Sequence, residues 1–291
     1  METAVTTLAE TARAAPRPAR PGRKPFTWRR GLLFVIMAGG AVVMFYPFWF
    51  MIDASLQSKG QYASGSGHSL VSWSKLVAAL PVVQQLTNSL IVCLLSLAII
   101  VLVSTTAGFA FAKLRYHGAT LAFLAIISAM LIPMQSIIIP TYVNLSRFNL
   151  LTSYAGAVLV YAALGAPFAT FLMTAYYRGF PDELIEAAVV DGLGYGRVFL
   201  RIALPLSVPA IVTVTVLQFI QIWDDLLVGL LFLQNPDERT ITVGLGVLSA
   251  GRVTDIPVLM AGSLVSAIPA VAVYLIFQRY LVSGLTAGMG K

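Results

Sequence analysis

Residues 86–112 read LTNSLIVCLLSLAIIVLVSTTAGFAFA, an apolar run with no charged side chain. A helix of about 20 apolar residues crosses a bilayer core about 30 Å thick, so this run is long enough to span a membrane. Five further runs have a comparable length, at 31–52, 120–142, 153–175, 206–233 and 258–280. Lipid offers the backbone no hydrogen-bond partners, and the runs are too long for barrel strands, so all six are predicted to be helices. The predicted fold class is therefore all-α, a polytopic membrane protein with six transmembrane helices.

The composition of the whole chain agrees with a membrane protein. Of the 291 residues, 58% are hydrophobic and 11% are charged, whereas soluble globular proteins carry about 25% charged residues. The one cysteine, Cys93, lies within an apolar run, which excludes an internal disulfide and a thiol–metal cluster. Pro47, Pro133 and Pro167 fall inside predicted spans. Each removes a helical hydrogen bond, so we expect kinks there.

A basic, proline-containing tail precedes the first apolar run. Residues 1–27 hold almost no large apolar side chains, so they are predicted to be a disordered cytoplasmic tail. Beside a membrane span, such a tail is typical of a topology signal and an anchor to anionic lipid, and no nucleic-acid partner is expected. The run 31–52 is longer than the apolar core of about 7–15 residues in a cleaved signal peptide, so it is predicted to be a retained span.

The distribution of lysine and arginine predicts the orientation of the spans. With the N-terminus inside, fourteen of the 19 Lys and Arg residues fall in cytoplasmic segments and five in outer segments. This excess predicts that both termini are cytoplasmic. The outer segments are then 53–85, with a short surface helix from Trp73 to Leu80, and 234–257, which opens with a turn at Gln234-Asn235-Pro236-Asp237.

The largest cytoplasmic loop, 176–205, is the most informative part of the chain. Pro181 suits a first helical turn, and Gly192 suits the left-handed residue that ends a helix, so the first loop helix is predicted from Pro181 to Asp191. A second short helix is predicted from Tyr195 to Ala203, stopped by Pro205. On the first helix Ile185, Ala188 and Val189 share a face, while the small Ala187 and Ala188 would let another surface approach the backbone.

The same loop carries a motif with fixed spacing. Glu186-Ala187-Ala188, three further residues and Gly192 are followed after nine residues by Ile202 and then by Leu204-Pro205. This pattern resembles the EAA motif of bacterial ABC importer permeases, and Asp191 and Phe199 match its commoner form. Several further stretches resemble the MalG-like carbohydrate branch of that family: Leu131-Ile132-Pro133-Met134-Gln135, Ile139-Pro140, Arg178-Gly179-Phe180-Pro181 and the segment from Arg279 to Gly288.

The resemblance implies a function and a set of partners. The chain would be the permease domain, residues 28–291, of an importer for a sugar or oligosaccharide in the bacterial inner membrane. It would pair with a second permease, two copies of an ABC ATPase subunit and an extracytoplasmic solute-binding protein. The ATPase-coupling residues implied by the motif are Glu186, Ala187, Ala188, Asp191, Gly192, Phe199, Ile202, Leu204 and Pro205.

Other interpretations of the chain stay open. The loop could instead be an amphipathic hairpin lying on lipid, although its carboxylates at 182, 183, 186 and 191 suit a basic protein groove better than anionic headgroups. The solute could be another polar molecule, such as a polyol or glycerol phosphate. From a different class, the chain could be a membrane scaffold that docks an ATPase. A channel is disfavoured because no ring of ligands or charges is evident.

The sequence carries no enzyme motif. It has no G-x-x-x-x-G-K-[ST] phosphate loop, no H-E-x-x-H and no G-x-S-x-G. We therefore expect no catalytic activity, no metal and no cofactor in this chain, with ATP and Mg²⁺ bound by the partner ATPase.

Polar residues in the fifth predicted span form a candidate substrate path. Asp224 and Asp225 lie about nine residues before its predicted outer end, which is about 13 Å deep at 1.5 Å per residue. Buried carboxylates cost about 2.5–3.5 kcal/mol each in a bilayer, so they should face a wet cavity or a partner. Trp223 adds an adjacent ring and Gln218 and Gln221 lie on the same helix; the family has a Trp-Asn-Asp/Glu-like stretch here, with Asp224 in place of Asn. The alternative is a structural pair packed against other helices.

Overall fold

The computed structural model describes residues 28–251 and 255–287. Within these ranges the secondary structure is helical, and no strand occurs in this part of the chain. The predicted disordered tail, 1–27, lies outside the described residues. The chain divides into two compact units, 1–50 and 51–291, and this division falls within the first predicted span.

The first span corresponds to α2 (Trp28–Ser55), which runs without a break through Pro47. Three other long helices belong to the second unit: α5 (Val82–Lys113), α8 (Tyr154–Arg178) and α15 (Ile256–Ala287). Helix α8 likewise runs unbroken through Pro167. These four helices of the described chain are long and apolar enough to cross a membrane.

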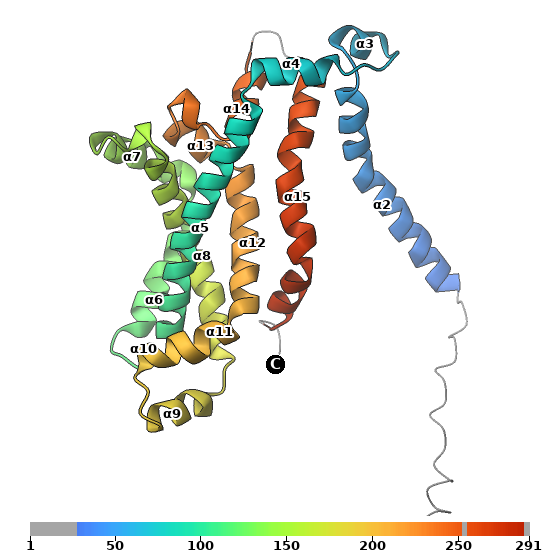
Figure 1. Ribbon diagram of the computed structural model, residues 1–291. Helices are drawn as coiled ribbons and strands as arrows, with labels where there is room; N and C mark the ends of the chain where they lie inside the picture. The colour runs from blue at the N-terminus through green and yellow to red at the C-terminus, as the bar shows by residue number, and fades with distance from the viewer. Residues whose placement is uncertain (1–27, 252–254, 288–291) are drawn as a thin grey trace, which may run out of the picture. The chain divides into compact units, whose positions relative to one another are not determined.

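The core of the second unit lies where α5, α8 and α12 (Val208–Asp224) meet, and α15 packs on α12 (Figure 1). Helices α5 and α8 are in close contact at Gly108, where a Cβ atom would lie 2.8 Å from the Met173 Cβ. A larger residue would therefore push the two helices apart. The most deeply buried apolar side chains here are Val92, Ile100, Ala157, Ala169, Met173, Val214 and Trp223.

Two predicted spans are broken. Helix α6 (Ala119–Ser128) continues into the short η1 (Ala129–Leu131), and α7 (Met134–Arg147) is bent by 99° from this pair after Leu131. Pro133 lies at this break in extended backbone, as expected for a residue that cannot donate to the preceding turn. The second break, of 71°, lies between residues 206 and 208. Counting each bent pair as one span gives six, the predicted number, although the second pair joins the loop helix at 195–206 to α12 and so begins before the predicted span 206–233.

The fifth span ends earlier than predicted. Helix α12 stops at Asp224, Asp225 is extended (φ −72°, ψ 128°), and a short α13 (Leu227–Phe232) follows. The predicted continuous span 206–233 is therefore wrong in its second half. An apolar run alone does not show this break, because the residues on both sides of it are equally apolar.

One end of the second unit carries short helices that connect the long ones (Figure 1). They are α3 (Lys59–Ser64), α4 (Val71–Ala79), η2 (Leu150–Thr152), η4 (Pro236–Glu238) and α14 (Ile241–Ser249). The predicted surface helix at 73–80 is α4, two residues longer at its start. The predicted turn at 234–237 leads into η4, whereas α14 was not predicted.

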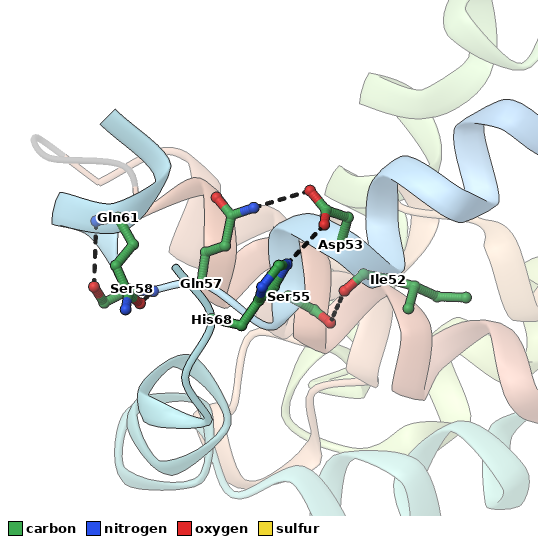
Figure 2. Close-up of polar contacts among 7 residues, drawn as sticks. All are labelled: Ile52, Asp53, Ser55, Gln57, Ser58, Gln61 and His68. Atoms are coloured by element: carbon green, nitrogen blue, oxygen red, sulfur yellow. Dashed lines mark hydrogen bonds and ion pairs between the residues drawn. The ribbon is translucent and has the colours of Figure 1, made fainter. Parts of the chain in front are cut away.

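The chain that enters α3 is fixed by local polar contacts, which Figure 2 shows. Asp53 accepts a hydrogen bond from Gln57 Nε2 at 2.9 Å and lies 2.9 Å from His68 Nε2. Ser58 and Gln61 form a capping box at the start of α3. These contacts fold residues 56–68 back onto the last turn of α2, which contains Asp53.

Candidate functional site

The loop between α8 and α12 projects at the opposite end of the second unit from α4 (Figure 1). It contains α9 (Asp182–Val190), α10 (Tyr195–Val198), the π-helical η3 (Phe199–Ala203) and α11 (Leu204–Leu206). Asp182 and Glu183 lie in the first turn of α9, where negative charge is favoured by the helix dipole. The predicted first loop helix is confirmed to within one residue at each end.

Gly192 ends α9 as predicted. Its φ is +87°, in the left-handed region, and its N–H donates to the Val189 carbonyl at 3.0 Å. The next N–H, of Leu193, reaches back to the Ala188 carbonyl at 3.0 Å. This pair of bonds closes the helix end in the way that favours glycine.

Pro205 does not stop the second loop helix, so that prediction is wrong. The helix widens into the π turn at Phe199–Ala203 and continues through Pro205 to Leu206. A wider turn removes the need for an N–H at the proline and gives its ring room against the preceding carbonyls. The chain turns only at Ser207, where it bends into α12.

The motif residues of α9 divide between two faces. Ile185 and Ala188 are 5% and 7% exposed, so they pack inside the chain. Glu186 and Ala187 are exposed. Of the two alanines expected to admit another surface, only Ala187 is therefore open to one, because Ala188 is covered by its own chain. Val189, expected on the same face as Ile185, is exposed.

The later motif residues attach the loop to the membrane helices. Phe199 lies 5.3 Å from Phe109 of α5, centroid to centroid. Phe199 and Ile202 are half-buried against the core, and the Leu204 carbonyl accepts a hydrogen bond from Ser207 Oγ at 2.9 Å. Of the remaining predicted coupling residues, Asp191, Gly192 and Pro205 are exposed.

Two tyrosines at the end of α8 hold the bend at Ser207. The Tyr177 hydroxyl lies 3.0 Å from Ser207 Oγ, and the Tyr176 hydroxyl donates to the Leu206 carbonyl at 3.1 Å. Tyr177 and Ser207 are both fully buried. Both ends of the loop are thus joined to α8, one through the chain and the other through side chains.

Lys113, at the end of α5, is a residue of the loop region that was not predicted to belong to the site. Its Nζ donates to the Phe180 carbonyl at 2.7 Å and to Asp182 Oδ1 at 2.5 Å. The hydrogen bond and charge of Lys113, with a smaller contribution from Arg115, hold the pKa of Asp182 below its ordinary value. Two features of the sequence could have indicated this contact: a single lysine at the end of a long apolar run, and acidic residues at the start of a later helix.

A groove of about 530 Å³ separates the end of α5 from the exposed side of α9. Leu114 and Arg115 line it on one side, and Glu186, Val190 and Tyr195 line it on the other. The groove lies beside the exposed motif residues, so a second surface that meets Glu186 and Ala187 would also border it.

The candidate substrate-path residues do not form a single cluster. Asp225 Oδ1 accepts hydrogen bonds from the Tyr161 hydroxyl at 2.9 Å and from the Val228 N–H at 2.8 Å. Trp223 is 1% exposed, and its indole N–H donates to the Ser266 carbonyl at 2.9 Å. Gln218 is also buried. These three residues have partners or packing within the chain.

Gln221 and Asp224 are the two exposed members of that set. They are three residues apart on α12 and therefore share one face of the helix. Asp224 was predicted to lie inside a continuous helix that runs to residue 233. This is wrong, because α12 ends at Asp224. Among the described residues, no group of three or more His, Cys, Asp or Glu side chains is placed to hold a metal ion.

Long apolar helices, two bent pairs and a folded loop at one end define a multi-pass α-helical membrane protein. Residues 14–286 match the family described as the binding-protein-dependent transport system inner membrane component. The chain belongs to this family, and so is the membrane component of a transport system and not an enzyme.

Relatives and a solved structure agree with this assignment. The chain is 28% identical to the sulfoquinovosyl glycerol transport system permease of Agrobacterium fabrum, covering 92% of this chain and 96% of that one. It is 30% identical to the arabinooligosaccharides transport system permease of Halalkalibacterium halodurans, covering 69% and 71%. A bacterial ABC transporter involved in alginate import has the same fold, with a TM-score of 0.73 at 20% identity over 91% of this chain and 99% of that chain.

Proposed function

We propose that this chain is one of two permease subunits of an ABC importer for a sugar or oligosaccharide. ATP hydrolysis by a separate pair of ATPase subunits would act on it through α9. The observation that carries the proposal is the division of the EAA-like motif. Glu186 and Ala187 are exposed on α9, while Ala188, Phe199 and Ile202 fix the loop to the membrane helices.

The exposed face of α9 suits a protein partner with a basic groove. Glu183, Glu186 and Asp191 are exposed and acidic, and Ala187 between them is small. Anionic headgroups repel such a face, which argues against a hairpin that lies on lipid. The rival proposal, a scaffold that docks an ATPase without transport, shares this face and differs in having no path for a solute.

A carbohydrate is the solute class that the relatives favour, since their names refer to a glycosyl glycerol and to arabinooligosaccharides. Within this chain, we propose that Gln221 and Asp224 face the path, where an amide and a carboxylate can bond sugar hydroxyls. Gln218, Trp223 and Asp225 would support them from inside. The binding protein on which transport by this family depends would deliver the sugar from outside the cell.

The test is uptake by cells that express the complete transporter. Radiolabelled arabinotriose and sulfoquinovosyl glycerol are offered beside glycerol 3-phosphate and mannitol. In a separate affinity capture, the proteins that are retained by the tagged chain are identified. We expect uptake of a carbohydrate and retention of an ATPase subunit and a second permease. If only mannitol or only glycerol 3-phosphate is taken up, the substrate is a polyol or a glycerol phosphate, and the proposed carbohydrate class is wrong. An ATPase subunit bound without uptake of any compound would favour the scaffold.

Orientation is a separate part of the proposal, in which both termini and α9 lie in the cytoplasm. Ser66 and Val190 are exposed, the latter by 85%, and lie in the α3 and α9 regions. With the buried Cys93 replaced by alanine, a cysteine at Ser66 should react with an impermeant thiol reagent in intact cells, and one at Val190 should react only after lysis. The reverse pattern would place α9 outside the cell and remove the proposed coupling.

A further inference from the structure

Lys113 has the least exposed charged side chain in the loop region. Its side chain is 4% exposed, whereas that of its partner Asp182 is 64% exposed. A buried ammonium group is tolerated only where it has partners. Its two partners, the Phe180 carbonyl and the Asp182 carboxylate, flank Pro181. One buried cation therefore holds both sides of the turn at which α9 begins.

The position of this contact suits both helices electrostatically. Lys113 is the last residue of α5 and Asp182 is the first residue of α9. A positive charge is favoured at the C-terminal end of a helix and a negative charge at the N-terminal end. The contact thus joins the two helix ends, and each end carries the sign of charge that its dipole favours.

Behind this contact the two long helices are packed tightly. The Phe180 ring lies 5.6 Å from the Tyr177 ring, and Tyr177 lies 5.7 Å from Phe109 of α5. Next to Phe109 on α5 and one turn before Tyr177 on α8, Gly108 and Met173 are in close contact. The turn before α9 is therefore attached to α5 and α8 at the same time.

We propose that Lys113 is a positioning residue that makes α9 move as one body with α5 and α8. A displacement of α9 by the ATPase then reaches both membrane helices and is not absorbed by rotation in the turn at 179–181. The inference rests on the proposed function of α9 and adds the residue through which the displacement is transmitted. Because Lys113 holds two acceptors and Asp182 supplies one, loss of Lys113 should have the larger effect.

The first experiment compares Lys113→Met, which keeps the length and removes the charge, with Lys113→Arg, which keeps a cation. Lys75→Met is the matched control, since Lys75 forms a more exposed ion pair with Asp255 at 3.2 Å at the other end of the unit. The complete transporter is assayed for retained ATPase subunit, ATP hydrolysis and uptake of radiolabelled arabinotriose or sulfoquinovosyl glycerol, whichever the unsubstituted transporter takes up. We expect Lys113→Met to keep the ATPase bound and lower uptake per ATP by about fivefold. Lys113→Arg should recover most of this ratio, and Lys75→Met should not change it.

A second experiment replaces the ion pair with a covalent bridge. Lys113→Cys and Asp182→Cys are combined in a Cys93→Ala background, so that the two new thiols are the only ones in the chain. A short, reducible bis-thiosulfonate then bridges them. If α9 and α5 move together, bridging restores uptake per ATP and reduction removes it again. If bridging stops uptake while the ATPase stays bound, α9 must slide along α5 and the inference is wrong.

The two proposals fail in different ways. If an Ala187→Asp variant and Lys113→Met both transport normally, α9 is not the point at which the ATPase acts, and the proposed function is wrong. If Ala187→Asp abolishes transport while Lys113→Met keeps the normal ratio of uptake to ATP, the proposed function stands and only the role of Lys113 is overturned.

Discussion

The loop at 179–207 and the helix break at 224–227 use polar residues in opposite ways. In the loop, the carboxylates of Glu186 and Asp191 are exposed, while buried apolar and aromatic side chains and the contacts of Lys113 and Ser207 hold the loop in place. At the break, the carboxylate of Asp225 is used to hold the structure, by accepting from Tyr161 and Val228. The exposed carboxylates of the loop are therefore available to a partner, whereas a polar residue inside an apolar helix bundle is first required to satisfy its own surroundings.

This difference makes the loop sensitive to changes in docking and the break sensitive to changes in stability. Four predictions test it, from the largest expected effect on transport to the smallest.

The largest contrast is between adjacent alanines of α9. Ala188→Asp places an unpaired charge in a site that is 7% exposed and should destabilise the loop by about 2 kcal/mol or more. Ala187→Asp lies on the exposed face and should leave folding unchanged while reducing retention of the ATPase subunit. Thermal unfolding in detergent, beside affinity capture, separates the two. Equal melting temperatures for both variants would show that Ala188 is not packed as described.

A smaller effect is expected at the end of α9. Gly192→Val puts a β-branched side chain at φ +87°, which costs at least about 1 kcal/mol. No atom lies within 4 Å of the added Cβ, so the change acts through the backbone alone. Uptake should fall by up to about tenfold.

Gly194→Val is the matched control, because Gly194 also has no neighbour within 4 Å but an ordinary φ of −72°. If both variants lower uptake equally, the left-handed turn is not what matters.

At the break, the neighbouring carboxylates should behave differently. Asp225→Ala removes the acceptor of the Val228 N–H in the first turn of α13 and leaves the Tyr161 hydroxyl without its acceptor, a loss of about 2 kcal/mol in stability. Asp224→Ala should change stability by less than about 0.5 kcal/mol. It should instead raise the apparent KM for sugar uptake. Melting temperature and initial uptake rates on the same preparations decide this, and a destabilised Asp224→Ala with normal KM would contradict the proposed path.

The smallest effect is expected at Trp223. Trp223→Phe keeps an aromatic ring to stack on Phe219, where the centroids are 5.3 Å apart, but removes the hydrogen bond to the Ser266 carbonyl. A loss of about 1 kcal/mol is expected, with uptake per transporter unchanged. A change in sugar selectivity without a change in melting temperature would mean that Trp223 reaches the solute.

Much of the fold follows from the lengths of the apolar runs, yet their continuity does not. The run 206–233 contains no proline after residue 209, and the break at Asp225 depends on a carboxylate that accepts a hydrogen bond from the first turn of α13. In contrast, Pro133 marks the break between α6 and α7 in the sequence itself. The loop helix at 182–190 was predictable because proline, two acids and a glycine fix its ends locally.

The site was predictable where the signal was local and was missed where it was not. The spacing from Glu186 to Pro205 identifies the motif, but not which members face outward. Lys113 was missed because its partners at 180 and 182 lie nearly seventy residues away, and the sequence gives no indication that α5 ends beside α9.

By itself, the sequence determined that this is a helical membrane protein, where its long apolar runs lie and which loop carries the EAA-like motif. These properties depend on hydrophobicity, helix-end residues and spacing, which act over a few turns of chain. Only the tertiary structure decided that Ala188 is covered while Ala187 is open, that Asp225 is a structural acceptor, and that Lys113 joins α5 to α9. Each of these depends on which segments distant in the chain are packed together, because burial and hydrogen-bond partners are properties of the packed chain and not of any local pattern.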